Sequence, residues 1–339
     1  MATLRTRTVK TSGGDYTSLA GWEAGEQGNL VTLDEIRQAE CYAMLDLSVP
    51  VFAGWTTDAT RYIHVIVPAS NRHLGKPDST SYRLASDSFS WAADVQVPNV
   101  IFEGLQVLTG SNGNPQGGFH FNAAINFGTC EVRECVFDWR TTPPPYASVG
   151  MEGATGGTFK VRNGSHASGA GITDFVKHQS GAGYTTYAYN LSAYSTYTGG
   201  FGRLYNQDGN GTMVCKNCVG AYQTASSNSC FNGTISGNNN CSSDATAPGT
   251  GSVTNQTPSF VSTANGDLHL QSGDTVAKGA GADLSADSNY AFTVDIDGQT
   301  RATPWEIGAD QLTIAASSDV AAAFFAANAF SNRQFGLRR

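Results

Sequence analysis

Charged residues are scarce in this 339-residue chain. Asp, Glu, Lys and Arg together make up 14%, close to half of their usual share in a globular domain. Helix-forming residues are also scarce between residues 60 and 310, where no amphipathic pattern persists for three helical turns. No stretch approaches the ~20 apolar residues of a membrane-spanning helix. These absences argue against a helical architecture and against a membrane protein.

Two features of secreted proteins are missing as well. Residues 1–10 lack the apolar core of a signal peptide, so we expect synthesis and folding in a cytoplasm. The seven cysteines are odd in number, which fits reduced, buried thiols better than a disulfide framework. A bridge between Cys230 and Cys241 would need an oxidising environment.

The net charge of −8 is distributed unevenly. Residues 1–10 carry +3 and residues 311–339 carry +2, which leaves −13 on the body between them. A nucleic-acid groove needs a basic stripe, so we expect no nucleic-acid partner. The basic ends fit either docking sites for another protein or a chance scatter of a few charges.

What the chain does contain is a repeat. Its five copies centre on Gly104, Glu134, Asn163, Asn190 and Asn217, at intervals of 30, 29, 27 and 27 residues. Each copy is a short alternating strand, a small or polar residue, a small apolar or Cys residue, and a second strand. A near-constant period built from strand and turn predicts an all-β solenoid, in which stacked coils bury a common core.

The flanking segments complete this organisation. Residues 1–30 are expected to form an N-terminal arm and cap, with a short helix that has Asp15 or Thr17 as N-cap and buries Leu19 and Trp22 on one face. The solenoid is expected over residues 31–310, with strands at 35–42 and 62–67. Its other expected segments are a Pro-rich loop at 141–146, a loop at 236–258 and terminal coils at 259–310.

Residues 311–339 change character and are expected to form a C-terminal arm, or else a helix packed along the solenoid. As an arm, this segment would attach the protein to a partner through exposed aromatic and basic side chains. The residues predicted for this contact are Phe324, Phe325, Phe330, Arg333, Phe335, Arg338 and Arg339.

The coils, together with Val294–Arg301 and Trp305–Ala309, resemble the right-handed parallel β-helix repeat proteins of the broad pectate-lyase-like class. The entry segments Gly13–Leu19, Ala39–Tyr42 and Gly54–Tyr62 are most similar to β-helix virion proteins of tailed bacteriophages. This resemblance implies a single right-handed parallel β-helix. It implies little about activity, because the fold supports lyases, hydrolases, adhesins and structural proteins.

A lyase or hydrolase of this fold would need clustered carboxylates. The candidates are Glu103, Glu134 and Asp138, with Asp174 and Asp208 further along the chain. Glu103 and Glu134 could lie near each other on neighbouring coils. The regular coils contain no Asp-Asp or Asp-x-Asp run, and the six histidines are scattered. We therefore interpret these acids as solvated surface residues rather than a catalytic set.

Three other patterns have a structural and a functional interpretation. Cys215-Lys-Asn-Cys218 with Cys230 and Cys241 is not far from zinc-knuckle spacing, but Cys218 shares the coil position of Cys135, which favours an inward ladder. Asp295-Ile-Asp-Gly298 predicts a tight turn rather than a Ca²⁺ loop. A tyrosine-rich stretch favours stacking along the rod, or else contact with a glycan or a second copy through Tyr187, Tyr194 and Tyr197.

Taken with the resemblance, these patterns predict a non-enzymatic virion structural protein of a tailed bacteriophage. A capsid decoration (cement) protein is favoured, bound to the major capsid protein or another virion protein through the terminal arm. We expect a homotrimer, no cofactor and no metal. The alternatives are a tailspike-like polysaccharide depolymerase and a glycan-binding β-helix module.

Overall fold

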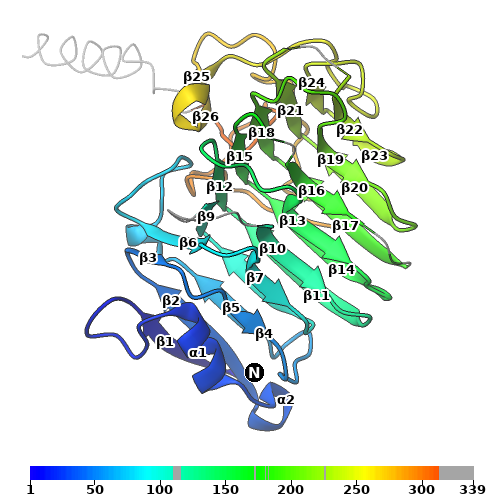
Figure 1. Cartoon of the computed structure of the whole chain (residues 1–339). Coiled ribbons are helices and arrows are strands. Elements are labelled where there is room, and N and C mark those ends of the chain that lie inside the picture. Colours follow the sequence, from blue (N-terminus) through cyan, green and yellow to red (C-terminus); the bar gives the residue numbers. More distant parts are fainter. Residues whose placement is uncertain (110–115, 172, 180, 182, 225–226, 313–339) are drawn as a thin grey trace, which may run out of the picture.

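A computed structural model describes residues 1–109, 116–171, 173–179, 181, 183–224 and 227–312 (Figure 1). The predicted contact residues of the C-terminal arm, Phe324 to Arg339, lie outside these described residues. The chain winds into a right-handed parallel β-solenoid, which confirms the fold expected from the repeat.

The described residues form three parallel sheets of nine, seven and eight strands. Each of the seven complete coils, from β2–β4 to β20–β22, contributes one strand to each sheet, while β1 adds a strand at one end and β23 and β24 form an incomplete coil at the other. The nine-stranded sheet contains β1 (Thr3–Val9), β2 (Glu35–Cys41), β5 (Ile63–Ile66), β8 (Val100–Glu103), β11 (Asn126–Arg133), β14 (Gly156–Arg162), β17 (Tyr184–Tyr189), β20 (Thr212–Lys216) and β23 (Ile235–Asn238). The seven-stranded sheet contains β4 (Val51–Phe52), β7 (Trp91–Val95), β10 (Gly117–Asn122), β13 (Ala147–Glu152), β16 (Asp174–His178), β19 (Arg203–Gln207) and β22 (Ser229–Asn232). The eight-stranded sheet contains β3 (Met44–Asp46), β6 (Tyr82–Ser86), β9 (Gln106–Thr109), β12 (Val136–Trp139), β15 (Ser165–Ser168), β18 (Ser192–Ser195), β21 (Val219–Tyr222) and β24 (Cys241–Ser242).

The repeat positions are the turns between the nine-stranded and eight-stranded sheets. All five residues on which the repeat aligns have a left-handed backbone: Gly104, Glu134, Asn163, Asn190 and Asn217, with φ between 47° and 73°. Asn and Gly tolerate this conformation, which lets a strand turn sharply with a single residue. Glu is an unusual residue there, so Glu134 requires an explanation from its contacts.

Aromatic rings and thiols fill the interior. Phe102 and Phe119, from two different sheets, stack with centroids 4.3 Å apart. All seven cysteines are buried and free, as the reduced-thiol interpretation predicts. Cys135 and Cys218 both point inward beside the turn residues, which confirms the ladder interpretation of the Cys-x-x-Cys segment.

The N-terminal residues are part of the sheet rather than a free arm, because β1 pairs with β2. The expected helix is α1 (Leu19–Glu26), and it buries Leu19 and Trp22 as predicted. Its N-cap is Ser18, whose hydroxyl accepts from the Gly21 N–H, and not Asp15 or Thr17. Asp15 instead accepts from Thr8, so that carboxylate is already occupied. A second short helix, α2 (Leu30–Leu33), precedes β2.

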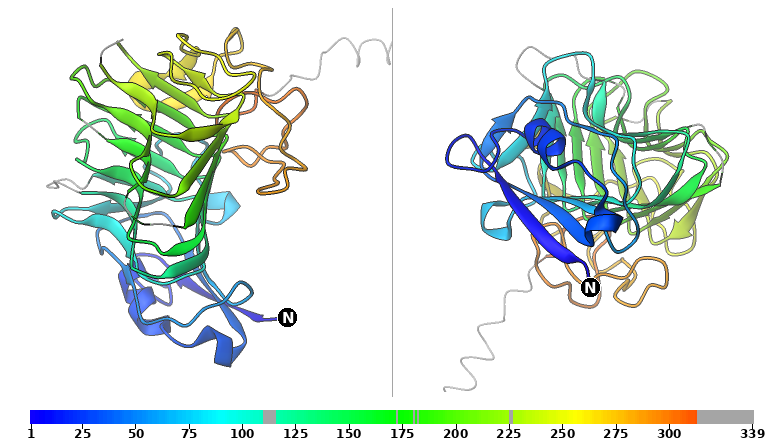
Figure 2. Two further views of the ribbon diagram at one scale, coloured as in Figure 1. Left: turned by 90° about the vertical axis from the view of Figure 1, so that its right-hand side faces the viewer. Right: turned by 90° about the horizontal axis from the view of Figure 1, so that it is seen from below.

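The last strand of the solenoid is β24, and parallel bridges of Thr250 to Asn238 and of Val253 to Cys241 extend the stack by part of a coil. The solenoid therefore ends well before the boundary at residue 310 that the sequence predicts. After it comes an antiparallel pair, β25 (Phe260–Ser262) and β26 (Asp267–Leu270), followed by an irregular segment up to residue 312. We call residues 257–312 the C-terminal lobe. It is drawn in yellow to orange in Figure 2, where its orange part folds back along one side of the upper coils. Aspartate side chains such as Asp274 accept several backbone N–H groups in this segment, which replaces the strand ladder of further coils.

The ladder of turn asparagines holds the lobe in place. The Asn163 and Asn190 amides donate to the carbonyls of Val294 (2.8 Å) and Gly308 (3.2 Å). Asn217 exchanges two hydrogen bonds with Ala282, both 2.8 Å long. The same residues that make the coil turns therefore also bind the C-terminal lobe.

Candidate functional site

The structure brings Glu103 and Glu134 together, as their positions on neighbouring coils suggested. The guanidinium of Arg72 lies between them, with Nη2 2.6 Å from Glu103 Oε1 and Nη1 2.7 Å from Glu134 Oε2. Arg72 follows a short 3₁₀ helix at Ala69–Asn71, and its Nε and Nη2 also donate to the Val67 carbonyl. Both carboxylates are thus fixed by one cation.

Further cations surround the same pair. Arg162 Nη1 lies 2.6 Å from Glu134 Oε1, and this contact accounts for a glutamate at the left-handed turn position. Arg133 contacts Glu103 and also lies 3.1 Å from Glu131. We call these residues, with Arg72, the ion-pair ladder; it runs along the outer face of the nine-stranded sheet.

The ladder leaves little capacity for catalysis. Burial alone would raise the pKa of Glu103, but contacts with His64, Arg133 and Arg72 outweigh it and hold the pKa well below its usual range. Tyr290 of the C-terminal lobe donates to Glu131 and covers this end of the ladder. A carboxylate stabilised as an anion by several cations is a poor general acid, so the ladder is a structural feature.

The other acids lie elsewhere. Asp138 is on the eight-stranded sheet, paired with Arg140 at 2.7 Å, and is not part of the ladder. Asp174 and Asp208 belong to the seven-stranded sheet and its edge, where the Asn206 amide donates to both. Burial raises the pKa of Asp174 to about 7.

Two of the three predicted tyrosines, Tyr187 and Tyr194, contact the protein's own C-terminal lobe, whereas Tyr197 bonds to Gly200 outside it. Tyr187 packs with the lobe cluster of Leu284, Tyr290 and Trp305, and its hydroxyl donates to Asn289. Tyr194 is buried against Phe260, with ring centroids 6.3 Å apart. The Tyr197 hydroxyl donates to the Gly200 carbonyl.

The segment Asp295–Gly298 forms the tight turn that its sequence predicts. The Asp295 side chain accepts from the N–H groups of Asp297 (3.0 Å) and Gln299 (2.8 Å). The backbone N–H of Gly298 donates to the Asp295 carbonyl.

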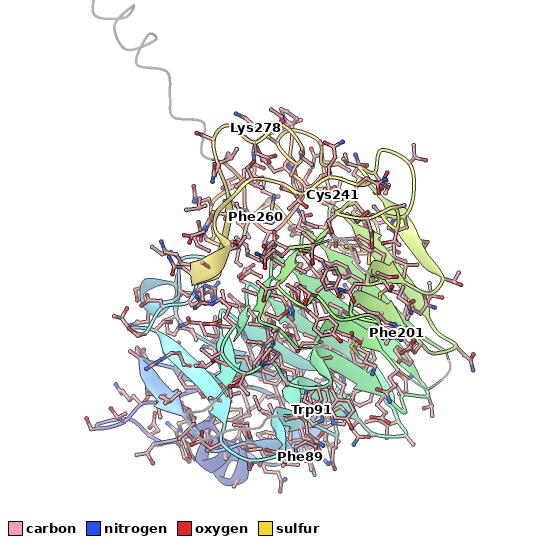
Figure 3. The ribbon with its side chains drawn as sticks, turned by 45° about the horizontal axis from the view of Figure 1, so that its top comes forward. Phe89, Trp91, Phe201, Cys241, Phe260 and Lys278 are labelled. Carbon is pink, nitrogen blue, oxygen red and sulfur yellow. The ribbon has the colours of Figure 1, made fainter. Side chains whose placement is uncertain are left out.

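The outer face of the seven-stranded sheet carries a cleft that sequence reasoning missed. It has a volume of about 310 Å³ and is lined by residues of β4, β7, β10 and their loops: Val49, Val51, Phe89, Ser90, Trp91, Asp94, Gln116, His120 and Asn122. Phe89 is 61% exposed, and Figure 3 shows it beside Trp91. The cleft therefore combines apolar aromatic surface with hydrogen-bonding groups.

The centre of this cleft is an ordered aromatic and acidic group. The Trp91 indole stacks on the His120 imidazole, with centroids 4.3 Å apart and planes within 9°. His120 lies between two carboxylates, with Nδ1 3.1 Å from Asp94 and Nε2 3.3 Å from Glu152. The three polar residues come from successive coils, so the stacking of coils positions them.

Two glycines make room for the indole. A Cβ on Gly117 would lie 2.2 Å from the Trp91 ring, and one on Gly150 would lie 2.8 Å from it. Glycine inside a strand weakens it and often marks a close approach by another group. Gly117 lies in β10, which is adjacent to β7, and Gly150 lies in β13, the next strand. These two glycines inside strands are the signal in the sequence that could have pointed to the cleft.

No protein-family model matches this chain, and no curated protein is significantly similar to it. Among the described residues, no helix is long and apolar enough to cross a membrane.

Proposed function

We propose that this protein is a glycan-binding β-solenoid that recognises a sugar chain in the Trp91–His120 cleft. The observation that carries the proposal is the Trp91 indole, which stacks on His120 in the cleft, next to the exposed Phe89 ring. Aromatic faces provide apolar contact area with little loss of conformational entropy, and the surrounding polar groups can accept and donate to sugar hydroxyls.

The charge of the cleft favours a particular sugar class. Its lining includes Asp94 and no Lys or Arg among the described residues, and Glu152 lies beside His120. Acidic polysaccharides would meet like charge there without a cation to bind their carboxylates. Neutral sugars, or amino sugars carrying a positive charge, fit this cleft better.

The biological setting that we propose is the one the sequence predicts: a structural protein of a tailed-bacteriophage virion, attached as a decoration protein through its terminal arm and assembled as a homotrimer. The rigid stack of coils supports this role, because it can hold a binding cleft at a fixed distance from an attachment point. Removing residues 313–339 tests the attachment: the truncated protein should remain folded but no longer bind to virus particles. Residue Gln311 must be kept, because its buried backbone N–H donates to Asp295.

The binding proposal is tested with purified full-length protein on an array of neutral, amino and acidic oligosaccharides. We expect binding to neutral or amino sugars and none to uronic-acid chains. Absence of binding to every sugar, or a preference for acidic chains, would contradict the proposal. Trp91→Ala should remove the binding, whereas Phe201→Ala, which truncates a 78% exposed aromatic elsewhere on the surface, should not (Figure 3).

A depolymerase is the alternative that one observation favours, namely the two carboxylates on opposite sides of His120. Glycosidases use paired carboxylates as acid and base or nucleophile. Incubation with the bound sugar should release no reducing ends if the protein only binds. Release that stops in both Asp94→Asn and Glu152→Gln, while Glu103→Gln remains active, would replace the binding role by an enzymatic one.

A further inference from the structure

A second polar cluster lies in the C-terminal lobe, away from the cleft. His269 Nε2, an Asp297 carboxylate oxygen and an Asp310 carboxylate oxygen lie within 4.8 Å of one another. Among the described residues, this is the one group of three or more His, Cys, Asp or Glu side chains so placed. The three come from β26, from the Asp295–Gly298 turn and from the end of the lobe.

The histidine is oriented by a fourth side chain. Its Nδ1 donates to Asp267 Oδ1 at 2.5 Å, which directs Nε2 towards Asp297 at 3.1 Å. A carboxylate bound to the far nitrogen is the usual partner of a metal-ligating histidine, because it fixes the ring and increases the basicity of the other nitrogen. The Asp310 carboxylate is fixed by the Leu270 N–H at 2.9 Å.

The backbone of the solenoid approaches this group closely. Gly75 lies against it, and a Cβ there would be 2.5 Å from His269 Nε2 and 2.7 Å from Asp297 Oδ1. Its φ of 63° also favours glycine. Two residues earlier, His73 is 1% exposed, and its Nε2 has no hydrogen-bond partner among the described residues. Such a buried donor is uncommon and is available to a bound water molecule.

We propose that His269, Asp297 and Asp310 bind one divalent transition-metal ion, with Asp267 as a positioning residue. One imidazole nitrogen and two carboxylates suit Zn²⁺ or Mn²⁺ with water completing the coordination. Ca²⁺ and Mg²⁺ prefer all-oxygen sites and should bind weakly.

Metal binding would join three segments of the lobe that are distant in sequence. His269 and Asp297 are 28 residues apart. Asp297 and Asp310 each lie a few residues after a carbonyl that accepts from the coils, Val294 from Asn163 and Gly308 from Asn190. An ion that binds only the folded lobe stabilises it by mass action. The C-terminal lobe should therefore be held more firmly on the coils in the metal-bound protein.

The test uses the full-length chain, stripped with EDTA and returned to metal-free buffer. Calorimetric titration should show one Zn²⁺ or Mn²⁺ bound per chain, and bound Zn²⁺ should raise the melting temperature. Ca²⁺ and Mg²⁺ at the same concentration should change neither. Co²⁺ should produce visible absorption bands of a site with nitrogen and oxygen ligands. Absence of binding by Zn²⁺, Mn²⁺ and Co²⁺ would overturn the proposal.

Variants locate the ion. Asp297→Asn and Asp310→Asn should each weaken Zn²⁺ binding at least tenfold, and Asp267→Asn should weaken it roughly 10- to 100-fold and shift the Co²⁺ spectrum. The control is Asp283→Asn, an exposed carboxylate of the same lobe. Unchanged affinity in the Asp297 and Asp310 variants, or an equal loss in the control, would place the ion elsewhere and contradict the assignment.

Discussion

The outer faces of the nine-stranded and seven-stranded sheets have the same backbone construction but very different side-chain chemistry. On the nine-stranded sheet, Glu103, Glu131 and Glu134 are each paired with arginines, and the C-terminal lobe covers the coils above them. On the seven-stranded sheet, Phe89 and Trp91 face an open cleft next to Asp94. The carboxylates of the first face are neutralised by arginines, whereas Asp94 and Glu152 of the second face pair with His120.

This difference separates stabilising residues from candidate binding residues. Both faces contain carboxylates and rings, so residue type alone does not distinguish them. What distinguishes them is the partner of each group: guanidinium groups and lobe residues on one face, and a single histidine, His120, between two carboxylates and an indole on the other. Exposed aromatic surface in a cleft with polar groups is therefore stronger evidence for a binding site than acidity itself.

Buried acids show the same contrast. Glu103 is paired with cations, and its pKa is held below its usual range despite burial. Asp174, on the seven-stranded sheet, has an amide partner, Asn206, at 2.8 Å, and burial raises its pKa to about 7. Their opposite responses to pH provide a direct way to test the comparison.

The largest effect is expected from breaking the ion-pair ladder. Arg72→Met leaves Glu103 and Glu134 buried with one cation fewer, which should lower the free energy of unfolding by roughly 3 kcal/mol. Urea unfolding at neutral pH measures this change. Arg203→Met removes the half-exposed pair with Asp208 and should cost less than about 1 kcal/mol. Similar losses in the two variants would mean that the ladder is not a buried structural element.

An effect of similar size but opposite sign is expected from Asp174→Asn. Because the folded pKa of about 7 lies above the usual 3.8, the folded protein binds the extra proton between these pH values. Its unfolding free energy must therefore fall as pH rises through this window. The variant lacks this penalty, so at pH 8 it should be more stable than the wild type by roughly 2–4 kcal/mol. At pH 4 the two should be equal, and lower stability of the variant at pH 8 would contradict the account.

The smallest effect on stability, but a specific one, is expected from Gly150→Ala. The three atoms nearest to the added methyl group, the closest at 2.8 Å, all belong to the Trp91 ring, so we expect the indole to move. Stability should change by less than about 1 kcal/mol, whereas sugar binding should weaken clearly. Gly273→Ala, where a Cβ meets nothing within 4 Å, is the control. Unchanged sugar affinity of Gly150→Ala would show that the indole position does not matter.

The architecture could be predicted because it depends on local, periodic features. Gly104, Glu134 and Asn163 mark the turns in the sequence, and all of them have the left-handed backbone in the structure. The end of the solenoid could not be predicted, because the C-terminal lobe is held by non-periodic contacts such as that of Asn217 with Ala282.

The candidate sites were harder to predict from the sequence, because they too depend on non-periodic contacts. Glu103 and Glu134 lie near each other as expected, but Arg72, which links them, belongs to a loop outside the repeat. Trp91 and His120 belong to neighbouring coils and lie outside the segments on which the repeat was aligned. Proximity between coils depends on register, and the register of the seven-stranded sheet was not visible in the repeated segments.

The central claim is that the open face of the seven-stranded sheet is the binding surface, and one paired titration tests it most directly. Calorimetry of a neutral or amino oligosaccharide found on the array should be carried out with the wild type, Trp91→Ala and Phe201→Ala at equal concentrations. The account predicts at least a tenfold loss of affinity for Trp91→Ala and none for Phe201→Ala. Equal affinities in all three proteins would contradict it.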